Sequence, residues 1–304
     1  MTGLLDRIGR GEVMLGDGGL GSLLIERGLQ PGQCPEAVVL EHPETLAEIG
    51  SLYLEAGAEV LTTDTFGGSP LKLKPYALEG EAESINRRAV KILREVAKDR
   101  ALVAASVGPS GAILKPYGDA EEDEVFASFE RQIRALAAAG ADAVYVETMT
   151  DLREASLAVK AAKAVAPELP VVATMTFDPT PRGFFTIMGT TVEPAAAGLQ
   201  EAGADVIGSN CGVGIGPMVE IAGEFRRHSR LPVVVQANAG LPQHRAGRVV
   251  YPETPEFMAG RVSELVRLGV AVIGGCCGTT PDHIRAMRHA LGPAGRVRRV
   301  ATDS

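Results

Sequence analysis

Three cysteines are the residues of this sequence whose type and placement most directly suggest chemistry. Cys276 and Cys277 are adjacent in GGCCG, and Cys211 lies in SNCG. A disulfide between adjacent cysteines needs a strained ring, so the pair more naturally directs two thiols toward another group. Zinc binds thiolates tetrahedrally, and three cysteine ligands leave one position open for a substrate. A thiol that enters this position is expected to lose its proton and become a nucleophile.

Other interpretations of the cysteines were weighed against this one. Free cysteines are often simply buried, which is the preferred interpretation for Cys34 in the early segment QCPE. A redox pair normally has CxxC spacing, and a magnesium ion would not select three sulfur ligands. A purely structural zinc usually has four protein ligands, whereas the sequence offers three strong ones. The pattern therefore favours a catalytic zinc site.

The segments that must position these cysteines repeat a simple pattern: an amphipathic stretch, a glycine, then a short β-branched run. The pattern occurs in EAGAEVLTTDT, AAGADAVYVET, EAGADVIGSN and RLGVAVIGGC. Each glycine lies where a helix end needs a left-handed residue, and each apolar run suits a strand covered on both faces. Alternating helices and buried strands predict a parallel sheet. The four glycines are Gly57, Gly140, Gly203 and Gly269.

Eight such strands are expected, which is the number that closes a (β/α)8 TIM barrel. They lie near residues 13–16, 60–63, 102–106, 144–147, 171–174, 206–209, 233–236 and 272–274. Helical periodicity between them, and a threonine before a proline at Thr254 and Thr280, support the alternation. An open doubly wound sheet would want a GxGxxG loop, which the run from Gly16 to Gly21 lacks. We predict one barrel over residues 1–292 and an exposed C-terminal tail over residues 293–304.

Polar residues follow several of these strands, and in a barrel that end of the sheet is the catalytic face. Asp17 follows the first strand, Glu147 closes the fourth and Asn238 follows the seventh. Asp17 could be a turn former, Glu147 a solvated loop acid and Asn238 a satisfied turn asparagine. A charged residue that directly ends a buried strand needs a partner, however, which favours a functional role for both acids.

Composition limits the classes of partner. The 304 residues include 30 basic and 38 acidic side chains, a formal charge of -8, which argues against binding to nucleic acid or anionic lipid. Hydrophobic residues make up 45% of the chain, yet no run of about 18 apolar residues occurs. Four cysteines are too few for a disulfide scaffold. We expect a cytoplasmic protein without nucleic-acid or membrane partners.

Seven motifs together resemble the homocysteine S-methyltransferase family. They are GDGGLGSLL, TTDTFGG, VETMTD, ATMTFD, GSNCGVG, ANAG and GGCCGTTPDHI. The resemblance covers roughly residues 10 to 292, and its most specific part is the NC and GGCCG pair. In the family this pair supplies three zinc thiolates. The resemblance implies an enzyme that methylates homocysteine to methionine through Cys211, Cys276 and Cys277.

The resemblance also implies how the substrate is held. It assigns Asp17 and Glu147 to the amino group of homocysteine, and the backbone amides of Gly18 and Gly19 to its carboxylate. Two carboxylates suit an ammonium group, and a glycine turn exposes its amides. Asn238 would occupy the fourth position on zinc until the substrate displaces it.

The methyl donor is the part that the resemblance defines least. ETMTD, MTFD and ANAG look most like the homocysteine-binding module of cobalamin-dependent methionine synthase, which implies a methyl-corrinoid (cobalamin) or methylfolate-derived carrier on a separate chain. Betaine and S-methylmethionine are the alternative methyl donors. A small thiol other than homocysteine is the alternative acceptor. The lack of tryptophan disfavours an aromatic cage for a quaternary ammonium donor. Surface or capping roles are expected for His42, His228, His244, His283 and His289, of which His283 merits a test.

Overall fold

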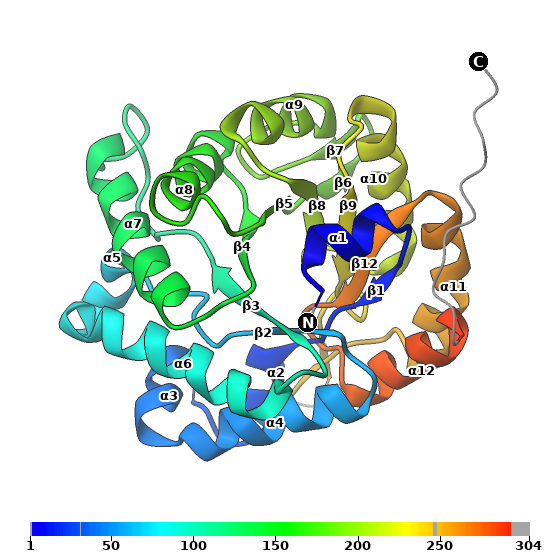
Figure 1. Cartoon of the computed structure of the whole chain (residues 1–304). Coiled ribbons are helices and arrows are strands. Elements are labelled where there is room, and N and C mark those ends of the chain that lie inside the picture. The colour runs from blue at the N-terminus through cyan, green and yellow to red at the C-terminus, as the bar shows by residue number, and fades with distance from the viewer. Residues whose placement is uncertain (1, 31, 246–247, 293–304) are drawn as a thin grey trace.

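The computed structural model describes residues 2–30, 32–245 and 248–292, and it forms a single (β/α)8 barrel as predicted (Figure 1). All eight barrel strands are parallel, in the order β1-β12-β9-β8-β5-β4-β3-β2. A parallel bridge from Gly16 to Val60 joins the two ends of this order. The strands are β1 (Met14–Leu15), β2 (Val60–Thr62), β3 (Leu102–Val107), β4 (Ala143–Met149), β5 (Val171–Met175), β8 (Val206–Asn210), β9 (Val233–Ala237) and β12 (Val270–Gly275).

Helices surround the strands as an outer ring (Figure 1). The glycines expected at helix ends adopt left-handed conformations, with φ between 76° at Gly269 and 104° at Gly203. Thr254 accepts a hydrogen bond from the Phe257 amide, which confirms its predicted role as a cap. The helices are α2 (Leu20–Glu26), α3 (Val38–Glu41), α4 (Pro43–Glu55), α5 (Pro70–Leu73), α6 (Ala82–Ala97), α7 (Glu122–Ala138), α8 (Leu152–Val165), α9 (Val192–Ala202), α10 (Ile215–His228), α11 (Pro255–Arg267) and α12 (Pro281–Leu291), with 3-10 turns η1 (Pro35–Ala37), η2 (Lys74–Tyr76) and η3 (Glu79–Glu81).

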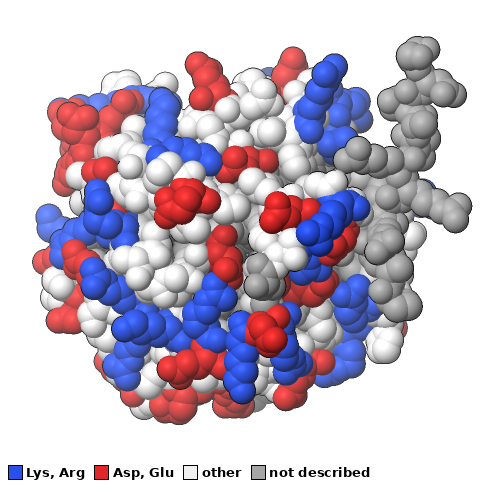
Figure 2. Space-filling view, viewed as in Figure 1, with Lys and Arg blue, Asp and Glu red and all other residues white. Residues whose placement is uncertain are grey.

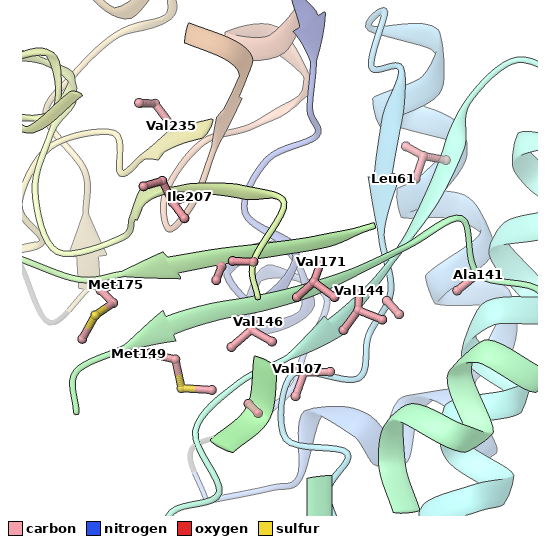
Figure 3. Packing of buried hydrophobic residues seen from close by; sticks show 14 of the residues in the cluster. Leu61, Val107, Ala141, Val144, Val146, Met149, Val171, Met175, Ile207 and Val235 are labelled. Atoms are coloured by element: carbon pink, nitrogen blue, oxygen red, sulfur yellow. The ribbon is translucent and has the colours of Figure 1, made fainter. Parts of the chain in front are cut away.

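Alternation along each strand creates two apolar layers. Outward residues such as Leu61, Val146 and Ile207 pack between the sheet and the helices (Figure 3). Inward residues such as Val60 and Tyr145 fill the interior of the barrel. Leu4 of an additional N-terminal helix, α1 (Leu4–Gly9), packs with them. This helix lies across the barrel in Figure 1. The catalytic face is therefore at the opposite end, where the parallel strands finish.

Two short hairpins on the catalytic face were not predicted. β6 (Asp178–Thr180) pairs with β7 (Gly183–Phe185) after β5, and β10 (Gln243–Arg245) pairs with β11 (Arg248–Val250) after β9. Strands of three residues carry too little alternation to be recognised in a sequence, and those of the first hairpin are not buried. The hairpins lengthen two of the loops that surround the site.

The charged surface agrees with the composition. Figure 2 shows Lys and Arg side chains interspersed with Asp and Glu on the face that carries α1. Within the described ranges, no helix is both long and apolar enough to cross a membrane. The predicted tail, residues 293–304, lies outside the described residues.

Candidate active site

The structure brings the three cysteines together at the catalytic face. Cys211 follows β8, and Cys276 and Cys277 follow β12. Their sulfur atoms lie within 4.8 Å of one another. Asp17 and Glu147 line the same cavity as these thiols, and its volume is about 230 Å³. Side chains from four strand ends thus share one small pocket.

The spacing of the sulfur atoms fits a tetrahedral zinc ion. Zinc to sulfur bonds of about 2.3 Å at tetrahedral angles place two sulfur atoms about 3.8 Å apart. The Sγ atoms of Cys211 and Cys277 are 3.9 Å apart. Among the residues that the structure describes, this trio is the one group of three or more His, Cys, Asp or Glu side chains close enough to share an ion. Three sulfur donors select a soft metal, so the geometry supports zinc over magnesium.

Hydrogen bonds among the thiols make the cluster a ready cation site. Donation from Cys276 and Cys277 lowers the pKa of Cys211. The bond to Cys211 raises the pKa of Cys276 well above its ordinary value, because Cys276 is the donor. A metal ion allows all three to ionise together.

Asp17 is held rigidly beside this cluster. Its Oδ2 accepts a hydrogen bond of 2.6 Å from the Thr62 amide, and its Oδ1 accepts one of 2.8 Å from the Thr62 hydroxyl. Burial raises its pKa to about 6 in spite of these bonds. The carboxylate gains from a cationic partner, because such a partner offsets the cost of burying its charge.

Glu147 reaches the same cavity from the end of β4. The Ser106 hydroxyl donates to its Oε1, and the Asn210 side-chain amide donates to its Oε2 over 3.4 Å. Burial raises its pKa to about 7, and the negative charge of Asp17 contributes to this shift. Two buried acids that repel each other form a suitable site for one ammonium group.

The glycine turn after β1 differs in part from expectation. The Gly19 amide already donates to Thr279, over 3.0 Å to Oγ1 and 3.3 Å to the carbonyl oxygen. The Gly18 amide has no hydrogen-bond partner among the described residues, so it remains available to a substrate carboxylate. A Cβ at Gly18 would lie 2.6 Å from Thr279 Oγ1, which explains the glycine there.

Asn238 lies against the cluster rather than in the cavity lining. It follows β9, and its side chain contributes to lowering the pKa of Cys211. Its Oδ1 is buried and has no partner among the described residues. A buried carbonyl oxygen without a partner could serve as a further ligand to an ion held by the three thiols.

Two neighbours of the cysteine pair were not identified from the sequence. Thr279 donates a 2.7 Å hydrogen bond to the Cys276 carbonyl and connects this turn to Gly19. Tyr251 lies close enough to affect the pKa of the Cys277 thiol, and its ring packs on Gly278. Thr279 lies inside the motif GGCCGTT, so its position was visible while its role was not.

Cys34 and His283, two further residues considered in the sequence analysis, make contacts typical of structural residues. Cys34 is buried and donates a 3.1 Å hydrogen bond to Glu36, and it is absent from the lining of the thiol cavity. His283 forms a capping box with Thr280 at the start of α12, and its Nε2 lies 3.0 Å from the Glu253 carbonyl oxygen. These contacts confirm the capping role of His283 and place Cys34 outside the thiol cavity.

Asp64 lines the cavity with a buried carboxyl whose Oδ2 has no partner among the described residues. Burial raises its pKa well above the ordinary value, and the charge of Glu36 adds to the effect. Folded Asp64 thus keeps its proton at pH values where the unfolded chain, with a pKa of about 3.9, has lost it. Stability consequently falls as pH rises between the unfolded and folded pKa values.

The variant Asp64→Asn is expected to lack this pH-dependent loss of stability. Between the unfolded and folded pKa values of Asp64, the free energy of unfolding of the variant minus that of the wild type should increase by up to about 1.4 kcal/mol for each pH unit. Urea unfolding at several pH values above 4 measures the difference, with Asp119→Asn at an exposed site as control. A difference that does not change with pH would mean that Asp64 is ionised in the folded protein.

Exposed apolar side chains lie in the loops on the catalytic face, and one of them, Phe66, lines the cavity. They belong to loops that follow β2, β3, β5 and β9. Apolar side chains exposed on the face that carries a cavity are candidates for contact with another molecule. We call this set the apolar rim; its members are Phe66, Ile113, Tyr117, Ile187, Met188, Leu241 and Val249.

Comparison with known protein families gives a match over nearly the whole chain. The family model described as homocysteine S-methyltransferase matches residues 14–291. Methionine synthase of Mycobacterium leprae is 33% identical over 309 residues, which cover 95% of this chain and 25% of that protein. Methionine synthase of Mycobacterium tuberculosis is 32% identical with the same coverage. The chain therefore spans about a quarter of the length of these curated relatives.

Solved structures share the fold. The metallated homocysteine methyltransferase MmuM of Escherichia coli superposes with a TM-score of 0.78 at 22% identity, covering 94% of this chain and 99% of that one. Pyruvate carboxylase from Rhizobium etli gives a TM-score of 0.58 at 16% identity, over 96% of this chain and 26% of that one. At these identities the likeness supports the barrel architecture alone.

Proposed function

The chain belongs to the homocysteine S-methyltransferase family, and from this premise we propose that it methylates homocysteine to methionine at a zinc site formed by Cys211, Cys276 and Cys277. The observation that carries the proposal is that one cavity contains the three thiols together with Asp17 and Glu147. Soft sulfur donors and paired carboxylates match the two ends of an amino acid that bears a thiol.

The side chains divide the binding of the substrate between them. Asp17 and Glu147 hold the ammonium group, and the Gly18 amide contributes to binding the carboxylate. Asn238 would be the residue that holds the ion, through its Oδ1, together with the three thiols until the substrate sulfur replaces it. A bound zinc ion would supply the positive charge that keeps the substrate sulfur ionised near neutral pH. The sulfur then forms a bond to the methyl carbon with its own electron pair, while the donor keeps the pair of the broken bond. The thiol proton is released to solvent.

We propose a methyl-corrinoid or methylfolate-derived carrier on a partner protein as the methyl donor. Two features support this: the 33% identity to a methionine synthase, and the apolar rim, whose exposed side chains suit contact with a protein. Betaine and S-methylmethionine are small molecules that would not need such a surface. Another small thiol as the acceptor is the remaining alternative.

The decisive experiment offers homocysteine to the purified zinc-loaded protein with methylcobalamin, betaine or S-methylmethionine in parallel reactions. Methionine formation with methylcobalamin supports the proposed donor. Activity with betaine or S-methylmethionine, but not with methylcobalamin, would show that the methyl donor is a small cationic molecule and would refute the proposed carrier. Methylation of other thiols, but not of homocysteine, would contradict the proposed acceptor.

A change in the apolar rim tests the protein carrier separately. Met188→Asp places a charge in the rim and is expected to lower kcat/KM with a methylated corrinoid protein about tenfold, which corresponds to about 1.4 kcal/mol at an interface. Free methylcobalamin should react at an almost unchanged rate. Leu5→Asp, on the helix at the opposite end of the barrel, is the matched control. Equal losses with the two donors would show that the rim does not bind a carrier protein.

A further inference from the structure

Asn210 connects the proposed amine-binding residues with the thiol cluster. It is the last residue of β8, immediately precedes Cys211, and is fully buried. Its side chain extends toward β4, where Glu147 and Thr148 lie. We assign Asn210 no direct contact with the substrate or the metal, so its burial between these residues needs another explanation.

The side-chain amide of Asn210 is surrounded by partners on every side. Its Oδ1 accepts 2.7 Å hydrogen bonds from the Thr148 amide and from the Thr174 hydroxyl. Its Nδ2 donates over 2.7 Å to the Thr148 hydroxyl. The same nitrogen lies 3.4 Å from Glu147 Oε2 and 3.9 Å from Cys276 Sγ. One rigid group thus touches an acid proposed for the amine and a thiol proposed for the metal.

The two hydrogen bonds to Thr148 fix an unfavourable backbone conformation. Thr148 has a φ of 60°, which is rare for a β-branched residue and unfavourable unless surrounding contacts hold it. Asn210 binds both the amide and the hydroxyl of this residue, directly after Glu147. Cys211, next to Asn210 in sequence, also has a φ of 60°. Strained residues therefore lie at the ends of both strands that Asn210 connects, and its bonds hold the irregular backbone of β4 directly after Glu147.

We propose that Asn210 is a positioning residue that holds the carboxylate of Glu147 and the sulfur of Cys276 at a fixed separation, so that the ammonium and thiol groups of one substrate bind together. The inference rests on the proposed function. It explains why an uncharged amide, with both donor and acceptor atoms, occupies this position: a carboxylate could not donate to Glu147 and Cys276, and an apolar side chain could not hold Thr148.

The test compares two thiols that differ only in the amino group: homocysteine and 4-mercaptobutyrate. In Asn210→Ala, the affinity for homocysteine should fall by about tenfold or more, the loss expected when a charge-assisted hydrogen bond is misplaced. The affinity for 4-mercaptobutyrate should change by less than about threefold, because it does not use Glu147. Calorimetric titration of the zinc-loaded protein measures both. A purely structural role would weaken both thiols by the same factor and overturn the proposal.

A milder variant guards against a folding defect in Asn210→Ala. Thr174→Val removes one hydrogen bond to Asn210 at similar side-chain volume, and Thr174 does not line the cavity. It should lower the affinity ratio of homocysteine to 4-mercaptobutyrate in the same direction by about threefold, as a lost neutral hydrogen bond predicts. Ser209→Ala is the control, since the Ser209 hydroxyl is buried without a partner among the described residues. An unchanged ratio in Thr174→Val would contradict the positioning role.

Cobalt substitution gives a measurement that does not require substrate. The charge-transfer absorption from sulfur to Co²⁺ should shift to lower energy in Asn210→Ala, because Cys276 loses a hydrogen bond and its sulfur becomes more electron-rich. If the wild type fails to bind homocysteine, the proposed function is wrong, yet this spectrum still tests the contact with Cys276. An unchanged spectrum would overturn the metal half of the inference.

Discussion

Replacement of Cys276 by Ala is expected to remove both the bound zinc and the methyl-transfer activity. The cavity contains three sulfur atoms within 4.8 Å of one another, and two of them cannot hold the ion in a tetrahedral site against competition from water and chelators. Elemental analysis should give about one zinc per chain for the wild type and far less than one for the variant. Cys277→Ala should behave in the same way.

Cys34→Ala is the matched control for this prediction. Cys34 is also buried, yet its thiol donates to Glu36 and does not line the thiol cavity. Its replacement should leave metal content and activity unchanged. X-ray absorption of the wild type should show three sulfurs and one light atom, changing to four sulfurs with homocysteine. Full activity in a metal-free preparation, or a shell that stays at three sulfurs, would refute thiol activation at this site.

The barrel could be predicted from the sequence because each repeat carries the same physical signals. A glycine in the left-handed region ends the helix, as at Gly57 and Gly140, and a β-branched run then forms a strand buried on both faces. All eight predicted strands are present, with ends that differ by a few residues. These signals are local, so they can be recognised in the sequence without knowledge of the tertiary contacts.

The position of the site could also be predicted, because polar residues replace apolar ones at the same inward positions. Two residues beyond Tyr145 comes Glu147, and two beyond Val234 comes Gln236. A strand whose inward face changes from apolar to polar marks the end where the barrel opens to ligand. Topology alone then brings Cys211, Cys276 and Cys277 together.

The connections between these groups could not be predicted. Asn210 binds Thr148, which lies 62 positions earlier in the chain, and Thr279 binds Gly19, which lies 260 positions earlier. No periodicity or spacing reports a hydrogen bond over such a separation. For the same reason the sequence could not show that the Gly19 amide donates to Thr279 and is therefore already engaged. What the sequence specifies locally is the set of functional groups, and their mutual orientation depends on the closed barrel.

Glu147→Gln is expected to weaken homocysteine binding by about 1.5–3 kcal/mol, the range for a hydrogen bond to a charged group, without removing zinc. Glutamine keeps the shape of the side chain and removes the charge that faces the ammonium group. The loss should depend on pH. Burial raises the pKa of Glu147 to about 7, so the wild-type carboxyl is ionised above that value and protonated below it. A protonated carboxyl resembles glutamine, so the variant and the wild type should converge as pH falls below about 6.

Comparing the two proteins at each pH isolates this carboxyl. Ionisation of the substrate thiol affects wild type and variant alike, so it cancels in the ratio of dissociation constants. The ratio therefore reports the charge of Glu147 together with its repulsion of Asp17, whose pKa burial raises to about 6. Glu154→Gln is the matched control, since Glu154 is equally buried but accepts its hydrogen bonds from Ser110, away from the cavity. Calorimetry across this pH range supplies the ratio. If the ratio stays constant with pH, or if Glu154→Gln weakens homocysteine as much, the ammonium group is bound elsewhere and the assignment of Glu147 is wrong.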